Sequence, residues 1–344
     1  MDNLTHSLTA FTLTRLLFPQ AGRGAVLAAI VAANAPDLDV ITGNWSRAHY
    51  LLLHRGVTHG VFGLLIGGLL CAGLMFPLLK KIEVKAPLSF LQLWLLCTVC
   101  ALSHLPLDFL NSYGVRPWLP FSEQRYFGDL LFVVDPWVWM ILGVGLFARV
   151  KWSPRQQVVW LFVTALGISA SWYVGMFDSS FWMPWLIVLA VLLSLSRYLK
   201  PLASLRTGPA IAVGVLALYL GFMAREHRIA EALTRAFAPD CPHFLTQPTP
   251  GTPWKFTVIG YDDTKASAYH VDVLDATVEV FATETRNLND PALEDVKEVL
   301  AVKAWRSFAR IPTVAHRPGQ LVLGDARYGM GRAQAWSELI IPLP

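Results

Sequence analysis

Long apolar runs dominate the first two thirds of the chain and restrict what it can fold into. Six uninterrupted runs lie at about 57 to 79, 88 to 110, 130 to 148, 157 to 175, 181 to 199 and 208 to 224. Each is close to the roughly 17 to 25 residues with which an α-helix crosses a bilayer. With 54% hydrophobic and only 15% charged residues, the chain is predicted to be a membrane protein.

Two shorter apolar segments, 4 to 18 and 24 to 36, precede these runs and are separated by a Pro- and Gly-containing break. We expect a helical hairpin here, because such a break marks a turn, so the chain has six to eight spans. The segment is not a cleaved signal peptide, since the basic residues Arg15 and Arg23 follow the first apolar stretch instead of preceding it.

Basic residues are distributed unequally between alternate loops. The better-supplied side holds Arg15, Arg23, Lys80, Lys81, Lys85, Arg149, Lys151, Arg155, Arg197, Lys200 and Arg206, and the other side holds only Arg47, Arg55, Arg116 and Arg125. Because cytoplasmic loops carry the excess of Lys and Arg, the first side is predicted to be cytoplasmic. With eight spans, the N-terminus and the tail then lie outside.

A polar tail follows the apolar region, and the boundary is predicted near Ala224. Residues 225–344 hold 15 of the 24 acidic residues. A helix is predicted at 225 to 237 and another at 291 to 309, with strands at 254 to 259, 269 to 273, 276 to 281, 320 to 323 and 334 to 342. The predicted fold is an all-α polytopic membrane helix bundle (1–224) with a small extracytoplasmic α+β domain (225–344).

Ionisable residues gather at the predicted outer ends of the helices. They are His6, His49, His54, His59 and His104, together with Asp37, Asp39 and Asp108. An ionisable group within a span costs on the order of 2.5 to 3.5 kcal/mol on insertion scales unless it is paired or coordinated. A bound cation would offset that cost, so the convergence favours a metal site.

The spacing of these residues supports coordination to different degrees. His104 and Asp108 are four apart and share one helical face, and Pro106 between them loosens the helix. His54 and His59 cannot both point inward from one regular helix, but the intervening Gly56 suggests that His54 lies in a loop and His59 begins the next span.

The acidic pair Asp37 and Asp39 follows Pro36 and is predicted to form a short non-helical turn that offers carboxylate oxygens. Imidazole with carboxylate suits zinc, manganese or iron, with zinc favoured and one or two ions held. Taken singly, His6 can be a helix-end residue and the two aspartates a solvated turn. His49 has no spaced partner and is not predicted as a ligand, and Asp135 before Pro136 is predicted to cap a helix. The seven residues at one depth together favour the metal site.

Four motifs in order carry a family resemblance: residues 1 to 6, ending in His6; 36 to 39; 54 to 59; and 104 to 114. Over about residues 1 to 140 the chain resembles the LexA-regulated, membrane-bound metal-dependent hydrolase family of the YdjM type. The resemblance implies a bacterial inner-membrane protein with hydrolase activity. Its metal-site set, carried over by position, is His6, Asp37, Asp39, His54, His59, His104 and Asp108.

Such a site predicts hydrolysis without a Ser or Cys nucleophile, because a divalent metal activates water and polarises a phosphoryl or acyl group. Asp39 is predicted as the general base. Arg55, Arg116 and Arg125 lie in the same outer loops and either clamp a substrate phosphate or face lipid headgroups. At the bilayer edge we expect a membrane lipid or lipid-linked substrate and no nucleic acid.

Two other functional classes stay open. A metal- or proton-coupled transporter would carry polar residues toward the cytoplasmic ends of its helices, whereas these spans are almost wholly apolar below the cluster. A membrane scaffold or stress factor would use the metal only for structure.

Overall fold

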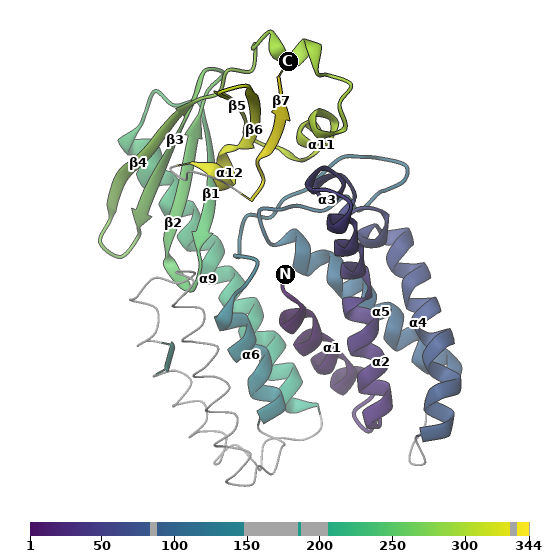
Figure 1. The fold of residues 1–344 in the computed structure, drawn as a ribbon. Helices are drawn as coiled ribbons and strands as arrows, with labels where there is room; N and C mark the ends of the chain where they lie inside the picture. The colour runs from purple at the N-terminus through teal and green to yellow at the C-terminus, as the bar shows by residue number, and fades with distance from the viewer. Residues whose placement is uncertain (83–87, 148–184, 187–205, 331–335, 344) are drawn as a thin grey trace.

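The computed structural model describes residues 1–82, 88–147, 185–186, 206–330 and 336–343 (Figure 1). The predicted spans at 157 to 175 and 181 to 199 lie outside the described residues, apart from 185–186. The remaining chain forms a helical region that carries a domain built on two β-sheets, as the sequence predicted at this level.

The named elements of the N-terminal region are all helices, and an irregular segment at 110–135 joins α5 to α6. In chain order its elements are α1 (Asn3–Leu17), α2 (Arg23–Asn34), the 3₁₀ helix η1 (Ala35–Asn44), α3 (Arg47–Leu53), the 3₁₀ turn η2 (Val57–His59), α4 (Val61–Ile82), α5 (Phe90–Phe109), α6 (Pro136–Phe147) and, after the gap, α9 (Thr207–Phe237). Four helical stretches within the described residues are long and apolar enough to cross a membrane: Arg23–Asn44, Val61–Lys81, Phe90–Phe109 and Thr207–Phe237.

Helix α2 occupies the centre of the bundle because its buried residues are small. Ala25, Ala29 and Ala33 pack in one cluster with Ala10 of α1 and Cys100 of α5. Two further alanines of α2, Ala28 and Ala32, pack on the other side against Ala72 of α4 and Leu93 of α5. Small residues let helix backbones approach closely in membranes, where packing replaces the hydrophobic driving force.

This packing predicts that extra volume at Ala28, which is fully buried, destabilises the bundle. The substitution Ala28→Leu should lower the free energy of unfolding by about 1–3 kcal/mol, as overpacking of a filled core does. Thermal unfolding in detergent micelles measures the change. The control Val31→Leu adds volume on the same helix at an exposed position, and an equal loss in both variants would contradict the close packing.

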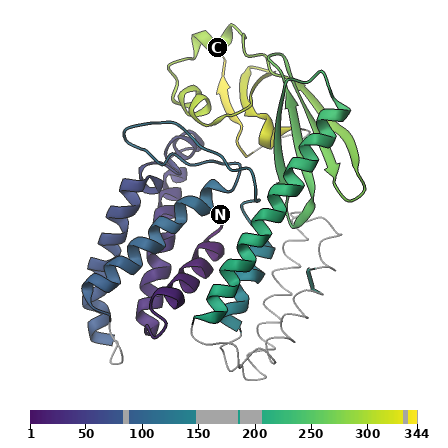
Figure 2. The ribbon, with the colours of Figure 1, turned by 180° about the vertical axis from the view of Figure 1, so that it is seen from behind.

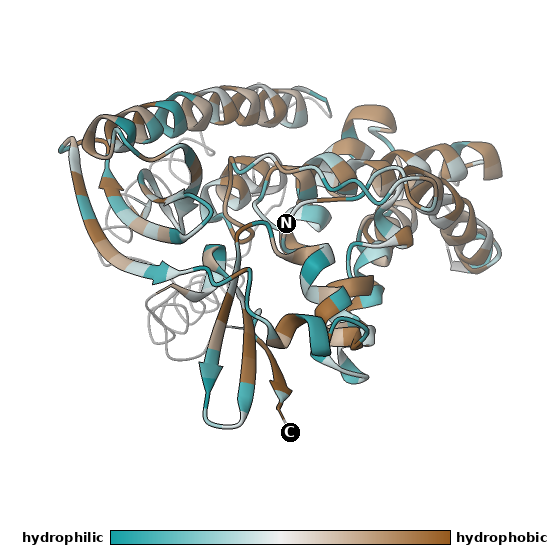
Figure 3. Ribbon diagram, turned by 90° about the horizontal axis from the view of Figure 1, so that it is seen from above, coloured by the Kyte–Doolittle hydropathy of each residue, from teal (hydrophilic) through white to brown (hydrophobic). Residues whose placement is uncertain are grey.

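The outer surfaces of the bundle are apolar. Large exposed hydrophobic side chains line α4 and α5, including Ile66, Leu70, Leu74, Leu91 and Leu95. Viewed from above, the bundle helices are largely hydrophobic and the C-terminal strands carry many hydrophilic residues (Figure 3). Exposed leucines at this density suit contact with lipid chains.

The C-terminal domain contains two antiparallel sheets. The first has the order β1 (His243–Thr249), β2 (Thr252–Tyr261), β3 (Lys265–Asp272) and β4 (Thr277–Thr285), and the second has β5 (Pro312–Arg317), β6 (Gln320–Asp325) and β7 (Leu339–Pro342). Short helices α10 (Ala292–Asp295), α11 (Leu300–Phe308) and α12 (Ala326–Gly329) lie between strands. The single helix predicted at 291 to 309 is therefore two helices, and β1 and β5 were not predicted.

Helix α9 joins the two regions without a break and passes through the predicted boundary at Ala224. Its C-terminal half lies along the back of the four-stranded sheet (Figure 2). Phe256, Val258 and Val271 of the sheet are buried in one cluster with Met223 and Ala230 of α9. Burial of this apolar face fixes the sheet to the end of the helix.

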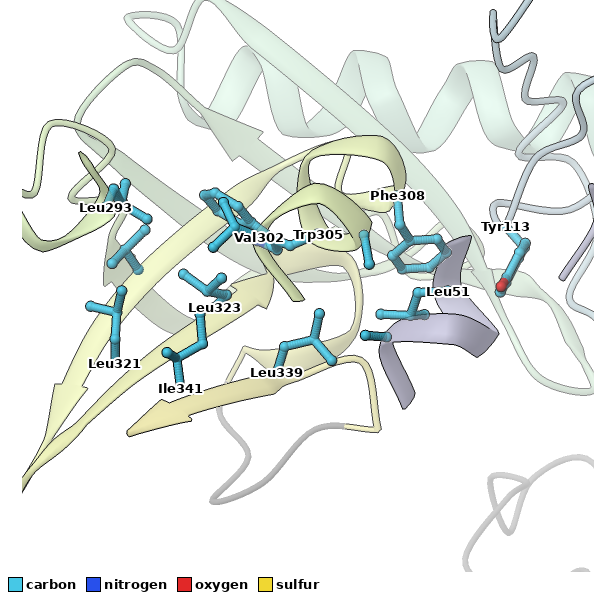
Figure 4. Packing of buried hydrophobic residues seen from close by; sticks show 13 residues of the cluster. Leu51, Tyr113, Leu293, Val302, Trp305, Phe308, Leu321, Leu323, Leu339 and Ile341 are labelled. Carbon is cyan, nitrogen blue, oxygen red and sulfur yellow. The ribbon is translucent and has the colours of Figure 1, made fainter. Parts of the chain in front are cut away.

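The second sheet shares its core with the helical region. Trp305 and Phe308 of α11 pack with strand residues and with Leu51 of α3 and Tyr113 (Figure 4). An ion pair of 2.5 Å between Arg310 and Asp129 adds a polar contact across the same boundary. Because one apolar cluster contains side chains from both regions, the C-terminal domain is held at one end of the bundle.

The opposite end of the bundle carries the described basic residues of the better-supplied loops. Arg15 lies in the last turn of α1, Arg23 begins α2, and Lys80 and Lys81 lie in the last turn of α4. These helix ends point away from the C-terminal domain (Figure 1).

Candidate metal centre

Four segments bring ionisable side chains together at the end of the bundle that faces the C-terminal domain. His6 comes from the first turns of α1, Asp37 from η1, His59 from η2, and His104 and Asp108 from the end of α5. The predicted non-helical turn at Asp37 and Asp39 is in fact the 3₁₀ helix η1, which begins with Pro36 in its first turn. Proline suits that position because its missing N–H would have no helical partner.

Two imidazoles and two carboxylates form the centre of the cluster. Asp37, His59, His104 and Asp108 each offer one donor atom within 4.8 Å of all the others, and three of the four are buried. Nε2 of His59 lies 3.3 Å from Asp37 Oδ1 and 3.6 Å from Asp108 Oδ2. Nε2 of His104 lies 3.5 and 3.4 Å from the same two oxygens.

These separations fit a single metal ion. Two ligands bound at about 2.1 Å in tetrahedral geometry lie about 3.4 Å apart, and all four measured nitrogen–oxygen distances are close to that value. Nε2 of His104 and Oδ2 of Asp108, two of these donor atoms, are also buried without a hydrogen-bond partner. Buried polar atoms are rarely left in this condition, so a cation bound by these atoms accounts for the arrangement.

The second nitrogen of each central imidazole is already engaged. Nδ1 of His104 donates to the backbone oxygen of Ala33 at 2.7 Å. Nδ1 of His59 faces Asp39 Oδ2 at 3.2 Å, and Thr58 donates its hydroxyl proton to the same oxygen at 2.7 Å. Such contacts fix the tautomer and orientation of metal-binding histidines. Both rings therefore present Nε2 to the centre.

Asp39 stands behind the centre. Its Oδ1 lies 2.6 Å from Nδ1 of His54, and its Oδ2 accepts from the backbone N–H of Arg55 at 3.1 Å. Both oxygens are occupied by neighbouring groups, and this geometry suits the orientation of His54 and His59. The role of Asp39 as general base stays a prediction. His54 is set outside the four-donor group, and burial lowers the pKa of its imidazole.

His6 adjoins the centre. Its ring stacks on that of His104 with centroids 3.7 Å apart, and its Nε2 lies 3.5 Å from Asp108 Oδ1. Of the seven predicted ligands, four form the centre and three, His6, Asp39 and His54, contact it. His49 bonds to Ser46. Asp135 caps α6 by accepting from the N–H of Trp137, as predicted.

Two positively charged groups contact the carboxylate of Asp108. Arg55 Nε lies 2.9 Å from Asp108 Oδ2, and the amino group of Met1 contacts Oδ1 of the same residue. Arg55 adopts a left-handed backbone conformation with φ of 55°, which costs a non-glycine residue about 1–3 kcal/mol. The loop from His54 to His59 bears this strain because its contacts with Asp39 and Asp108 hold it in place.

The other two predicted substrate-binding arginines lie differently. Arg116 donates to the backbone oxygen of Leu52 at 2.7 Å, and Arg125 donates to that of Tyr113 at 3.4 Å. Burial, with Arg116 nearby, lowers the pKa of Arg125 to about 9, so its guanidinium is still charged at neutral pH. Both contacts support the loops around the centre, whereas Arg55 reaches the cluster itself.

A cavity of about 1290 Å³ opens beside the cluster. One part of its wall comes from the helical region and includes Asp37, His54 and Arg55. The other part comes from the C-terminal domain and includes Lys255 and Trp336. Sequence reasoning assigned no functional residue to the tail, because no local motif marks side chains that meet only when the two regions dock.

Comparison with known proteins extends the resemblance seen in the motifs. Residues 1–177 match the YdjM inner membrane protein family. The chain belongs to this family. The segment that matches the YdjM family contains every residue of the cluster and ends before the C-terminal domain. The uncharacterized protein YfhP of Bacillus subtilis is 25% identical over 122 residues, which cover 36% of each chain, and no solved structure matches.

The cluster predicts a graded loss of metal in this YdjM-family chain. His59→Ala removes a central donor and should abolish stoichiometric metal binding. Asp39→Asn removes the charge and one of the acceptor oxygens behind His54 and His59, and should weaken metal affinity about 10- to 100-fold. Elemental analysis and competition with a chelating dye measure both. His49→Ala is the control, and a similar loss in that variant would contradict the assignment.

Proposed function

We propose that this protein is a metal-dependent hydrolase that cleaves a phosphoester of a lipid or lipid-linked substrate at the outer face of the inner membrane. The four-donor cluster at the edge of a large cavity is the observation that carries the proposal. The membrane family and the apolar helices support a membrane-bound substrate. The basic residues at the far end of the bundle support an outward-facing site.

Asp37, His59, His104 and Asp108 would hold the ion. When bound there, a divalent cation lowers the pKa of water and polarises a phosphoryl oxygen, so hydrolysis needs no protein nucleophile. Zinc suits two imidazoles and two carboxylates, and manganese or iron would also fit this donor set.

We assign proton transfer to His54. Asp39 holds its Nδ1 at 2.6 Å, and the side chain lines the cavity, so Nε2 is the nitrogen left for a substrate or water. In hydrolysis the oxygen of water bonds to phosphorus while the ester P–O bond breaks. His54 would accept the proton from water and return it to the departing oxygen, a role in which a positioned base contributes about 10²- to 10⁴-fold.

Arg55 supplies fixed positive charge next to the cavity. Its guanidinium also bonds to the side-chain oxygen of Asn111 at 2.9 Å, so it is held rigidly. A rigid charge beside a phosphoryl group stabilises negative charge that develops during cleavage without reorganisation.

The proposal predicts separate effects on chemistry and on metal binding. His54→Gln should lower kcat about 10²- to 10⁴-fold with metal content unchanged, because this side chain lies outside the donor set. Phosphate release from phospholipid and polyprenyl phosphate substrates in mixed micelles measures the rate. His49→Gln should retain full activity, and an unchanged rate in the His54 variant would contradict its role.

A structural metal is the second candidate, and the number of donors favours it. Structural zinc sites are usually closed by four protein ligands, whereas catalytic sites keep a position open. The centre contains four donors, so a tetrahedral ion would be fully coordinated unless a carboxylate is displaced or the ion accepts further ligands.

Metal removal separates the two candidates. We expect chelation to abolish hydrolysis while the helical circular dichroism signal and the thermal transition are largely kept, with activity restored by added metal. Loss of the folded state on chelation would instead assign the ion a structural role.

The transporter alternative has little support in the described helices. Below the cluster the buried polar side chains of α1, α2, α4 and α5 are Thr12 and Thr14, both in α1. An ion pathway through a bundle needs polar or ionisable residues along its length, and no charged side chain is buried in these four helices below the cluster.

A further inference from the structure

The four-stranded sheet has a face that changes character along its length. Near one end, Leu245, Ile259 and Ala268 are buried against Ile311 and Met330 of the second half of the domain. Further along the same face the side chains become polar. They are Gln247 of β1, Lys255 and Thr257 of β2, His270 and Asp272 of β3, and Thr277 and Glu279 of β4, which pair across the strands as neighbours.

This polar half of the face lines the cavity beside the metal centre. The opposite face of the same strands is apolar and packed on α9. Residues two apart lie on the same side of a strand, so the polar side chains all face the cavity. Asp37, His54 and Arg55 line the same cavity from the helical region.

The polar face carries charges of both signs, Lys255 against Asp272 and Glu279. Lys255 and Asp272 lie 4.0 Å apart, and His270 pairs with Glu279 across β3 and β4. Hydroxyl and amide groups lie between them. A polyanion would be recognised by clustered cations, whereas a mixture of donors and acceptors suits a neutral ligand with many hydroxyl groups.

Aromatic rings and the size of the cavity point to the same ligand. His270 stacks on Phe281 at 3.9 Å, and Tyr50 and Trp336 also line the cavity. Its volume of about 1290 Å³ exceeds the roughly 300–1,000 Å³ typical of small-molecule pockets. A phosphate group alone would leave most of this space unfilled.

We propose that the polar half of the sheet face binds the sugar of a phosphosugar whose phosphate lies at the metal centre. This inference rests on the proposed hydrolase function and names its substrate class. It assigns the C-terminal domain, which lies outside the family match, to substrate selection, with Thr257 and Glu279 as sugar-binding residues.

Calorimetric titration of the full-length, metal-loaded protein in detergent tests the inference. The probes are glucose 1-phosphate and glycerol 1-phosphate, which share the phosphate monoester and differ in the sugar. We expect at least tenfold tighter binding of the glucose ester. The double variant Thr257→Ala, Glu279→Ala should reduce this preference to less than threefold while metal content and the Kd of glycerol 1-phosphate stay unchanged.

Thr283→Ala, an exposed position of β4 away from the cavity lining, is the matched control and should keep the preference. Equal binding of the two probes by the unmodified protein, no binding of either, or an undiminished preference in the double variant would overturn the inference. Comparison of an alkyl phosphoglucoside with glucose 1-phosphate separates a lipid-linked from a soluble phosphosugar. Tighter binding of either one than of glycerol 1-phosphate supports a phosphosugar as the substrate class.

Failure of the hydrolase proposal gives a different pattern. If the glucose ester binds with the expected preference but no phosphoester is cleaved, the sugar site is supported and the hydrolase proposal is contradicted. If a phosphoester is cleaved without any preference for the sugar, the hydrolase proposal is supported and the sugar site is contradicted.

Discussion

Carboxylates withdrawn from water at the end of an apolar bundle are the constraint on which this structure depends. Asp108 is fully buried and Asp37 and Asp39 are largely so. A buried carboxylate is expensive unless positive charge or hydrogen bonds compensate it. Here the compensation comes from Arg55, the amino group of Met1, imidazoles of three segments and, in our proposal, a metal ion. The cluster thereby ties α1, η1, the His54–His59 loop and α5 to one point.

The same constraint explains why the cluster is layered. Asp37 and Asp108 direct oxygens toward the imidazole Nε2 atoms, whereas Asp39 faces the Nδ1 atoms of His54 and His59. Asp37 and Asp39, two residues apart, thus contact different nitrogens of the imidazoles because η1 turns their side chains in different directions. A central site with an orienting carboxylate behind it is the arrangement that raises ligand basicity and fixes ring orientation in metal proteins.

Sequence reasoning located the cluster but not its layers. The predicted spans placed seven side chains at one depth, and the family resemblance carried the same set. The spacing of His104 and Asp108 and the break at Gly56 supported the prediction, because helical periodicity and a turn signal determine the local geometry. Which of Asp37 and Asp39 faces the centre depends on the register of the 3₁₀ helix η1. The sequence pattern predicted only a turn at these residues. Strand β1 was not predicted because it contains Pro248, which argues against a strand in a sequence, although an edge strand tolerates proline.

Contacts between distant segments were beyond prediction for a different reason. Leu51 and Phe308 are 257 positions apart in the chain, and neither has a local signal that names its partner, yet they share one core. The polar face of the sheet likewise has no local signal of a binding site, since only the docking of the domain turns it toward a cavity. The helical character of the first region and the mixed helix and strand character of the second were therefore predictable, and the cavity between them was not.

The shared core also determines how the C-terminal domain relates to the chemistry. Helix α3 ends at Leu53, directly before His54, and Leu51 is buried against α11 of the domain. Tyr113, which packs against Phe308, also contacts the rings of His54 and the guanidinium of Arg55. Packing in the domain core thus positions the residue that we assign to proton transfer. Removal of the whole domain would expose this apolar surface and release α3, so its effect on activity would combine lost substrate binding with a displaced His54. Substitutions on the polar sheet face leave that core intact, and they are the changes that isolate the contribution of the domain to substrate selection.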